Sequence, residues 1–262
     1  QGYRENSKFK SDIFNFDLSF LKDPTNRYFA KLNYSEQLTE IPGNITLTDF
    51  NTRPRYSRTP EDFGTEKVNS ISIGSQNILD TGTRFSNVFK FEDKDQTTSA
   101  LSGTRYILAK TNLETSTLSS NISKNQELNN IDLDSKLGLD VFSSAYRAIG
   151  NDYYQVKYNN VATQTIIEPF GIFKFNHSSI ESLDYEIGFR YHYYELDTDN
   201  YTTKTSLSSD DRQNYAWSIG ANYNLRNGEN IFTHISRAYR APRLDEIISL
   251  ISPSPTHSHI KH

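Results

Sequence analysis

Three arginines and a tyrosine lie close together in one polar stretch of the chain: Arg53, Arg55, Tyr56 and Arg58. Guanidinium groups form charge-assisted hydrogen bonds with anions, and a neighbouring aromatic ring can stack on a flat ligand. Placed in a loop, this cluster predicts a surface that holds a catecholate, a carboxylate or a haem propionate. A loop that is simply solvated, or one that contacts lipopolysaccharide, would have the same composition, so these interpretations stay open beside ligand binding at this point.

A second group with possible chemistry is the set of histidines near the end of the sequence, His257, His259 and His262. Imidazole nitrogens suit zinc, copper and nickel, which makes these residues candidate metal ligands. Their spacing matches no recognised ligand motif, and a structural or catalytic site needs several fixed ligands. The three histidines are therefore weak candidates, and the sequence leaves open whether they bind a metal.

The sequence indicates no enzymatic chemistry and no cofactor. It lacks a Gly-x-Ser-x-Gly elbow, a His-Glu-x-x-His pair and a glycine-rich phosphate loop, and without cysteine it can form neither disulfides nor a catalytic thiolate. Its net charge of -4 and scattered basic residues argue against a nucleic-acid partner. Acidic pairs without EF-hand spacing are expected in loops, at Asp93, Asp95, Asp197, Asp199, Asp210 and Asp211.

The elements that must position these residues are strands. Apolar and polar residues alternate strictly over residues 183–193 and 215–225, which places every apolar side chain on one face of an extended strand. Asn227 and Gly228 then supply the positive φ angles of a tight hairpin turn. At about 3.3 Å per residue, such strands are long enough to cross a bilayer.

The same pattern predicts ten strands and no helix: residues 12–21, 28–38, 68–78, 83–92, 105–122, 133–147, 163–176, 183–194, 213–226 and 229–241. The pattern is weakest over residues 105–122, where the periods mix. Only 35% of residues are hydrophobic, the mean hydropathy is -0.70, and 13% are aromatic. No apolar run approaches the roughly 18 residues of a transmembrane helix, whereas this composition suits a wall that is polar inside and apolar outside.

Short and long connections alternate along the chain, the long ones being residues 39–67, 93–104, 148–162 and 195–212. In a meander this places tight turns at one end and loops at the other, as in outer-membrane barrels. The sequence therefore predicts an all-β, antiparallel, up-and-down transmembrane β-barrel, present in part as about ten strands of a larger barrel. A soluble sandwich is the alternative, but its strands are typically only about 5–6 residues long.

Residues 231–246 resemble a strand of the TonB-dependent outer-membrane receptors, in which an aromatic and a Ser-Arg pair precede Arg-Ala-Pro and acidic residues. The residues that carry this resemblance are Arg237, Tyr239, Arg240, Ala241, Pro242, Asp245 and Glu246. Pro lacks an N–H, so Pro242 is expected to end the ladder where the strand leaves the membrane. The charged residues of this segment are expected to line the lumen.

The resemblance implies a receptor in the bacterial outer membrane that takes up a scarce nutrient, with a ferric siderophore or other iron complex as the expected substrate. Haem, cobalamin, zinc and sugars stay open. The family's barrel has about 22 strands and an N-terminal plug. Neither plug, TonB box nor C-terminal strand is recognisable, so residues 1–262 are expected to be an internal fragment of the barrel.

The implied partners are TonB with its inner-membrane energising complex, acting through a region outside these residues, and outer-membrane lipid with lipopolysaccharide. A small metal complex is the implied substrate. Two other functions remain open at this point: a passive porin or channel, and a soluble all-β binding or adhesion module.

Overall fold

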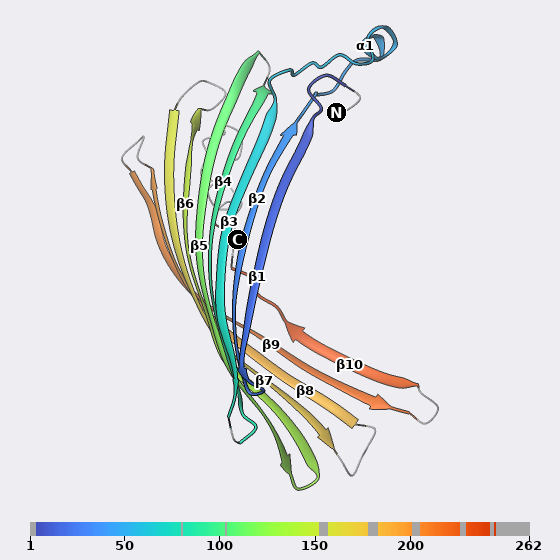
Figure 1. Cartoon of the computed structure of the whole chain (residues 1–262), viewed down its shortest axis with the longest axis vertical. Coiled ribbons are helices and arrows are strands. Elements are labelled where there is room, and N and C mark those ends of the chain that lie inside the picture. The colour runs from blue at the N-terminus through green and yellow to red at the C-terminus, as the bar shows by residue number, and fades with distance from the viewer. Residues whose placement is uncertain are drawn as a thin grey trace.

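A computed structural model describes residues 4–79, 81–102, 104–151, 157–177, 183–200, 205–225, 229–241 and 244. These residues form one antiparallel sheet in which each strand pairs with its neighbours in sequence (Figure 1). The ten strands are β1 Phe9–Asp23, β2 Asn26–Glu40, β3 Phe63–Ile78, β4 Arg84–Ser102, β5 Arg105–Leu128, β6 Ile131–Asn151, β7 Lys157–His177, β8 Leu183–Asn200, β9 Thr205–Asn224 and β10 Asn230–Arg237. All ten predicted strands are present.

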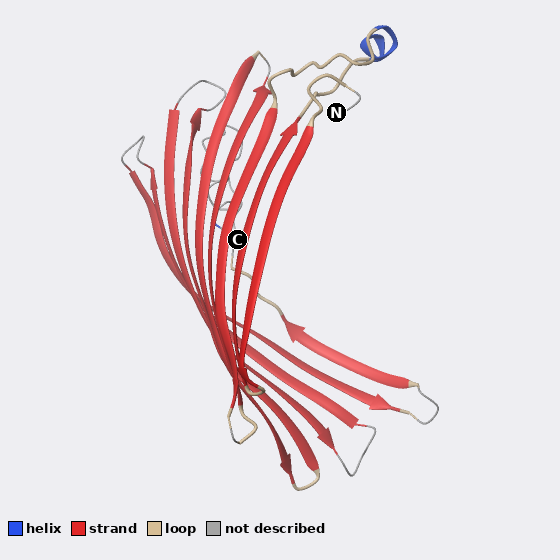
Figure 2. Cartoon of the chain, viewed as in Figure 1, coloured by secondary structure: helices blue, strands red, loops and turns tan. Residues whose placement is uncertain are grey.

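The sheet is a single curved layer, as Figure 2 shows, with β1 and β10 as its two edges. No second sheet or helix layer covers its convex side in the described part of the chain. The prediction of a partial up-and-down barrel is therefore confirmed, and a two-layer sandwich is excluded because its apolar rows would be buried between sheets.

The two faces of the sheet differ in chemistry. On β8, Tyr185, Ile187, Phe189 and Tyr191 lie on what we call the outer face, and the alternating residues lie on the lumen face. The register continues these apolar rows across the sheet, through Phe189 with Trp217 on β9. Because these side chains are exposed in the isolated chain, with Phe189 at 49%, they contact hydrocarbon rather than a protein core.

Three of the predicted long loops are mostly strand, and this part of the prediction is wrong. β4, β6 and β8 continue to Ser102, Asn151 and Asn200, so among the connections that the structure describes only residues 41–62 are long. These extensions are polar, and each is paired with a neighbour that satisfies its backbone groups. The acidic pairs expected in loops are consequently on strands, where the Asn112 amide donates to Asp93 at 2.8 Å and to Asp95 at 3.0 Å.

The long connection contains one short helix, α1 Leu47–Thr52, although no helix was predicted. Its local signal is Thr46 followed three residues later by an acidic residue, which is a capping pattern. The Thr46 hydroxyl oxygen accepts from the backbone N–H of Asp49 at 3.1 Å. The helix is too short to show an apolar stripe, which is why periodicity did not reveal it. Nowhere in the described chain does a helix have the length and apolarity to cross a membrane.

Candidate functional site

Four ionisable side chains from three neighbouring strands meet on the lumen face: Asp140 on β6, Glu168 on β7, and Arg190 and His192 on β8. The Arg190 guanidinium lies 2.8 Å from an Asp140 carboxylate oxygen and 2.6 Å from one of Glu168. The other Glu168 oxygen lies 2.7 Å from Nδ1 of His192, whose residue is only 4% exposed. We call this group the lumen network.

The sheet register explains why these residues meet. Asp140 is directly opposite Glu168, and Arg190 is opposite Phe170, two residues beyond Glu168 on the same face. The Arg190 guanidinium also lies over the Phe170 ring, 4.6 Å from its centroid. Since a charge on the lumen face is tolerated only when it is hydrated or paired, the cross-strand pairs make this buried cluster possible.

One buried polar atom of the lumen network, Nε2 of His192, has no hydrogen-bond partner among the described residues. The other ring nitrogen, Nδ1, is taken by Glu168. One guanidinium faces two carboxylates, so the network carries an excess negative charge while the imidazole is neutral. The geometry therefore fixes the side chains of three strands relative to one another and keeps Arg190 partly exposed to the lumen.

The chain enters the lumen after β10. The ladder ends at Arg237. We call the described residues that follow, 238–241 and 244, the strap, of which Tyr239, Ala241 and Leu244 pack against the lumen face of β6 to β8. Leu244 is 3% exposed in a cluster whose other buried members are Ala148, Ala162, Tyr194 and Leu196. The strap also covers the lumen network, since the ring of Tyr239 meets that of His192 edge to face.

The strap changes two expectations for the predicted signature. The ladder ends before the strap rather than at Pro242, and Arg237 lies opposite Trp217 on the outer face instead of in the lumen. Its guanidinium is 4.1 Å from the centroid of the Tyr215 ring. Tyr239, Arg240 and Ala241 lie in the described part of the strap, with Tyr239 and Ala241 packed against the wall. Pro242, Asp245 and Glu246 lie outside the described residues.

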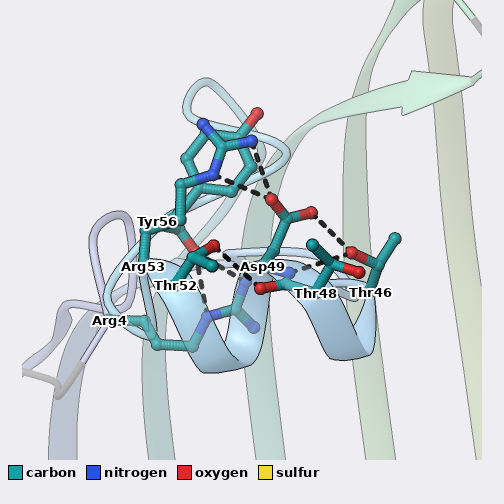
Figure 3. Close-up of polar contacts among 7 residues, drawn as sticks. All are labelled: Arg4, Thr46, Thr48, Asp49, Thr52, Arg53 and Tyr56. Atoms are coloured by element: carbon teal, nitrogen blue, oxygen red, sulfur yellow. Dashed lines mark hydrogen bonds and ion pairs between the residues drawn. The ribbon is translucent and has the colours of Figure 1, made fainter.

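The predicted ligand-binding loop lies beside α1, and Figure 3 shows its polar contacts. Arg53 forms an ion pair with Asp49 at 2.8 Å and places its guanidinium 3.8 Å from the centroid of the Tyr56 ring. The Arg53 guanidinium and the Thr46 hydroxyl hold the pKa of the Asp49 carboxyl below its usual range, and Asp49 in turn raises the pKa of Arg53. Arg53 and Tyr56 are therefore in contact, and the Arg53 charge is already paired with Asp49.

Arg4 anchors this loop to the start of the sheet, a role that the sequence did not suggest. Its guanidinium donates to the carbonyl oxygens of Gly43 at 2.6 Å and Pro42 at 3.1 Å. It also donates to the carbonyl oxygen of Tyr56 at 2.9 Å (Figure 3). Such a set of bonds gives the loop a defined shape. Arg55 and Arg58 remain exposed on its surface.

The structure does not address the histidine candidates for metal ligands. His257, His259 and His262 lie outside the described residues. Within the described ranges, no group of three His, Cys, Asp or Glu residues is placed to hold a metal ion.

The lumen face is hollowed beside the free edge of β10. A cavity of about 420 Å³ is lined by ionisable and amide side chains, among them Lys174, Glu186, Asn222 and His234. Lys174 and Glu186 form an exposed ion pair at 3.1 Å. The wall therefore presents hydrogen-bond donors and acceptors, and charges of both signs, to a solute in the lumen.

Comparison with known proteins agrees with this architecture. The profile of the family described as "TonB dependent receptor-like, beta-barrel" matches residues 2–257. The structure is similar to that of the unliganded ferric citrate transporter FecA, with a TM-score of 0.80 and 14% identity over 89% of this chain and 36% of that one. No curated protein matches in sequence.

Two further structures resemble this chain. The ferric-catecholate import receptor Fiu of Escherichia coli K12 gives a TM-score of 0.75 at 12% identity, over 92% of this chain and 48% of that one. BauA, the ferric preacinetobactin receptor of Acinetobacter baumannii, gives a TM-score of 0.72 at 5% identity, over 89% of this chain and 40% of that one. The chain thus spans less than half the length of each. It belongs to the TonB-dependent receptor family and forms part of a β-barrel wall in the Gram-negative outer membrane.

Proposed function

We propose that this chain is part of the barrel wall of a receptor that takes up a ferric siderophore or another iron complex. TonB and its inner-membrane complex would supply the energy, through a plug and a TonB box outside these residues. The family match supports TonB coupling. The iron-complex class is supported by the similar structures, which are receptors or transporters of ferric citrate, ferric catecholates and ferric preacinetobactin.

The observation that carries this proposal is the strap seated on the lumen network. An open water-filled pore needs only a hydrated polar lining. Here the chain turns into the lumen after Arg237, buries Leu244 against the wall and covers His192 with Tyr239. A wall with a chain segment fixed inside it suits a receptor that captures its substrate better than a passive channel.

Substrate capture is proposed to begin at the loop that contains α1. Arg55 and Arg58 are exposed, and Arg53 pairs with Asp49 and lies over the Tyr56 ring. Two exposed guanidinium groups on a loop that Arg4 keeps in shape can form charge-assisted hydrogen bonds with an anionic iron complex. The substrate would then move along the polar lumen face.

Uptake of radioactive iron complexes by cells that express the complete receptor tests the proposal. We expect uptake that disappears when the tonB gene is deleted or the proton-motive force is collapsed. Uptake that is independent of TonB, with steady ion conductance in planar bilayers, would instead assign a passive channel.

Charge reversal tests the loop separately. Replacing Arg55 and Arg58 together by Glu should weaken binding of an anionic complex to cells by about tenfold or more, since each charge-assisted bond contributes about 1.5–3 kcal/mol. Lys22→Glu is the matched control, because Lys22 is an exposed cation on β1 at the opposite end of the wall. Equal binding by both variants would remove the loop from the proposal.

A further inference from the structure

A second hollow of the lumen face lies on β3 to β6, and it is lined by positively charged side chains. The hollow has a volume of about 420 Å³ and contains Arg84 on β4 and Lys136 on β6. Lys136 lies four residues before Asp140 on the same strand, so it points to the lumen face as the lumen network does. We call this hollow the basic cavity, and its polar lining includes Gln76, Ser86, Asn121 and Ser123.

The register places the two cations on either side of one hydroxyl group. Ser123 on β5 is directly opposite both Arg84 on β4 and Lys136 on β6. Since neighbouring strands lie about 4.8 Å apart, the backbones at Arg84 and Lys136 are about 10 Å apart. Both side chains are exposed and long, so their charged ends can meet at a single small group above Ser123.

Other cations on this face are already paired within the sheet. Ion pairs with carboxylates are formed by Lys31, Lys90, Lys94, Lys174 and Arg190. The Arg84 side chain forms no ion pair or hydrogen bond with another described residue. Lys136 has only the Phe170 ring, whose centroid is 5.8 Å from its ammonium nitrogen. Both cations of the basic cavity are therefore available to a ligand.

The carboxylate that lies beside the basic cavity does not neutralise it. Asp134 is two residues from Lys136 on β6 and on the same face, and no ion pair joins these two described residues. One carboxylate would in any case offset only one of two positive charges. The basic cavity therefore keeps an excess of positive charge.

The basic cavity also offers neutral hydrogen-bond donors. The side chains of Gln76 and Asn121 have no hydrogen-bond partner among the described residues. Each amide has two N–H groups that can donate to an anion. Gln76 and Asn121 lie one step along their strands from the row of Arg84, Ser123 and Lys136, so charged and neutral donors surround the same space.

We propose that the basic cavity is a binding site for a carboxylate group. The guanidinium of Arg84 presents parallel N–H donors that match the two oxygens of a carboxylate, and the ammonium of Lys136 adds a point charge. The carboxylate comes either from a solute in the lumen or from an Asp or Glu side chain of a segment inside the complete barrel. The chemistry of recognition is the same for both sources.

The basic cavity is separate from the proposed capture loop. Arg84 begins β4 after the tight turn that follows Ile78, whereas residues 41–62 join the opposite ends of β2 and β3. The two sites thus lie at opposite ends of the wall (Figure 1). The inference therefore holds whether or not that loop captures an iron complex.

Zero-length cross-linking of the complete receptor tests for a carboxylate that the protein supplies. A carbodiimide joins an amine to a carboxylate that touches it, and mass spectrometry identifies the linked peptides. If a segment inside the barrel fills the basic cavity, Lys136 should be linked to an Asp or Glu of that segment. Arg84→Gln should lower the yield of this product. Lys31→Gln should not, because Lys31 is a cation of the same face that is already paired with Asp17.

Protection from acetylation tests for a free solute, with malonate as the probe. If no such cross-link forms, malonate at about ten times its dissociation constant should slow acetylation of Lys136 by about tenfold. Arg84→Gln should raise the malonate concentration for half protection by about tenfold or more, since a charge-assisted hydrogen bond is lost. Lys31→Gln is again the matched control and should leave the protection unchanged.

Two results would overturn the proposal. One is the absence of both a cross-link to another segment and protection by malonate, whether or not Lys136 becomes linked to Asp134. The other is an equal effect of Arg84→Gln and Lys31→Gln in both measurements, because Arg84 and Lys136 would then not share one ligand.

Discussion

The ring of Tyr239 meets the ring of His192 edge to face, with centroids 5.1 Å apart and planes inclined by 65°. This contact joins two parts of the chain with different roles. His192 belongs to the lumen network that links β6, β7 and β8, and Tyr239 belongs to the strap that enters the lumen after β10. The wall and the strap are therefore packed together at one site, and a substitution in one should alter the stability of the other.

The first prediction concerns the carboxylate at the centre of the lumen network. Glu168→Gln keeps the size of the side chain but removes the charge that pairs with Arg190 and His192. Leaving partly buried donors without their ionised acceptor costs about 1–3 kcal/mol of folding free energy. The thermal unfolding midpoint of the receptor should therefore fall. Glu186→Gln is the control, since its ion pair with Lys174 is exposed and should contribute at most about 1 kcal/mol. Equal midpoints for the two variants would show that the network adds no stability.

A second prediction concerns the seat of the strap. Leu244→Ala removes an almost fully buried side chain from its cluster. Such changes cost about 2–5 kcal/mol, so strap amides should exchange hydrogen at least about 30-fold faster when measured by mass spectrometry. Leu47→Ala, at a position 77% exposed on α1, should leave strap exchange unchanged. If Leu244→Ala also leaves it unchanged, the strap is not held by this residue.

A third prediction concerns a close approach within the wall. The Phe170 ring covers Gly138 on the neighbouring strand, and a Cβ at position 138 would collide with that ring. Gly138→Val should destabilise the barrel by about 1–3 kcal/mol in urea unfolding and shift Phe170 from beneath Arg190. Gly64→Val offers the comparison, because a Cβ at Gly64 meets no atom within 4 Å. Wild-type stability of both variants would argue against this packing.

The fourth prediction is a pH response at α1. The pKa of Asp49 is lowered by Arg53 and Thr46, so its ionised form stabilises the helix start. This stabilisation is fully present above the ordinary aspartate pKa of about 3.9 and is lost as the pH falls through the lowered value. Amide NMR shifts of residues 47–53 should therefore change over this acidic range, and Asp49→Asn should abolish the change. A variant that titrates like wild type would assign the response to another group.

The strands could be predicted because their information is local. Period-two alternation found all ten, and it missed mainly their ends, where polar extensions pair above the membrane without an apolar face. The mixed pattern over residues 105–122 belongs to β5, with 24 residues the longest strand, because pairing on both sides overrides its weak local signal. Where such a strand ends is decided by the pairing of neighbouring strands rather than by the residues of the segment itself.

The lumen network could not be predicted in the same way. Asp140, Glu168 and Arg190 are far apart in sequence, and only the register of β6, β7 and β8 brings them together. Each is visible as a charge at a lumen position of its strand, so a correct register would have been sufficient to find the cluster. The ligand loop was recognisable from its composition, whereas its anchor Arg4 is an isolated residue with no pattern around it.

The central claim is that hydrocarbon contacts the outer face, and Trp217 allows it to be tested directly. It is the only tryptophan of this chain and lies on the outer face opposite Phe189. With tryptophans elsewhere in the complete receptor replaced, its fluorescence should be quenched strongly by brominated phospholipids and weakly by aqueous iodide. The pair Trp217→Phe and Ser218→Trp moves the probe to the lumen face and should reverse this order. Quenching of Trp217 by iodide rather than by brominated lipid would contradict the account.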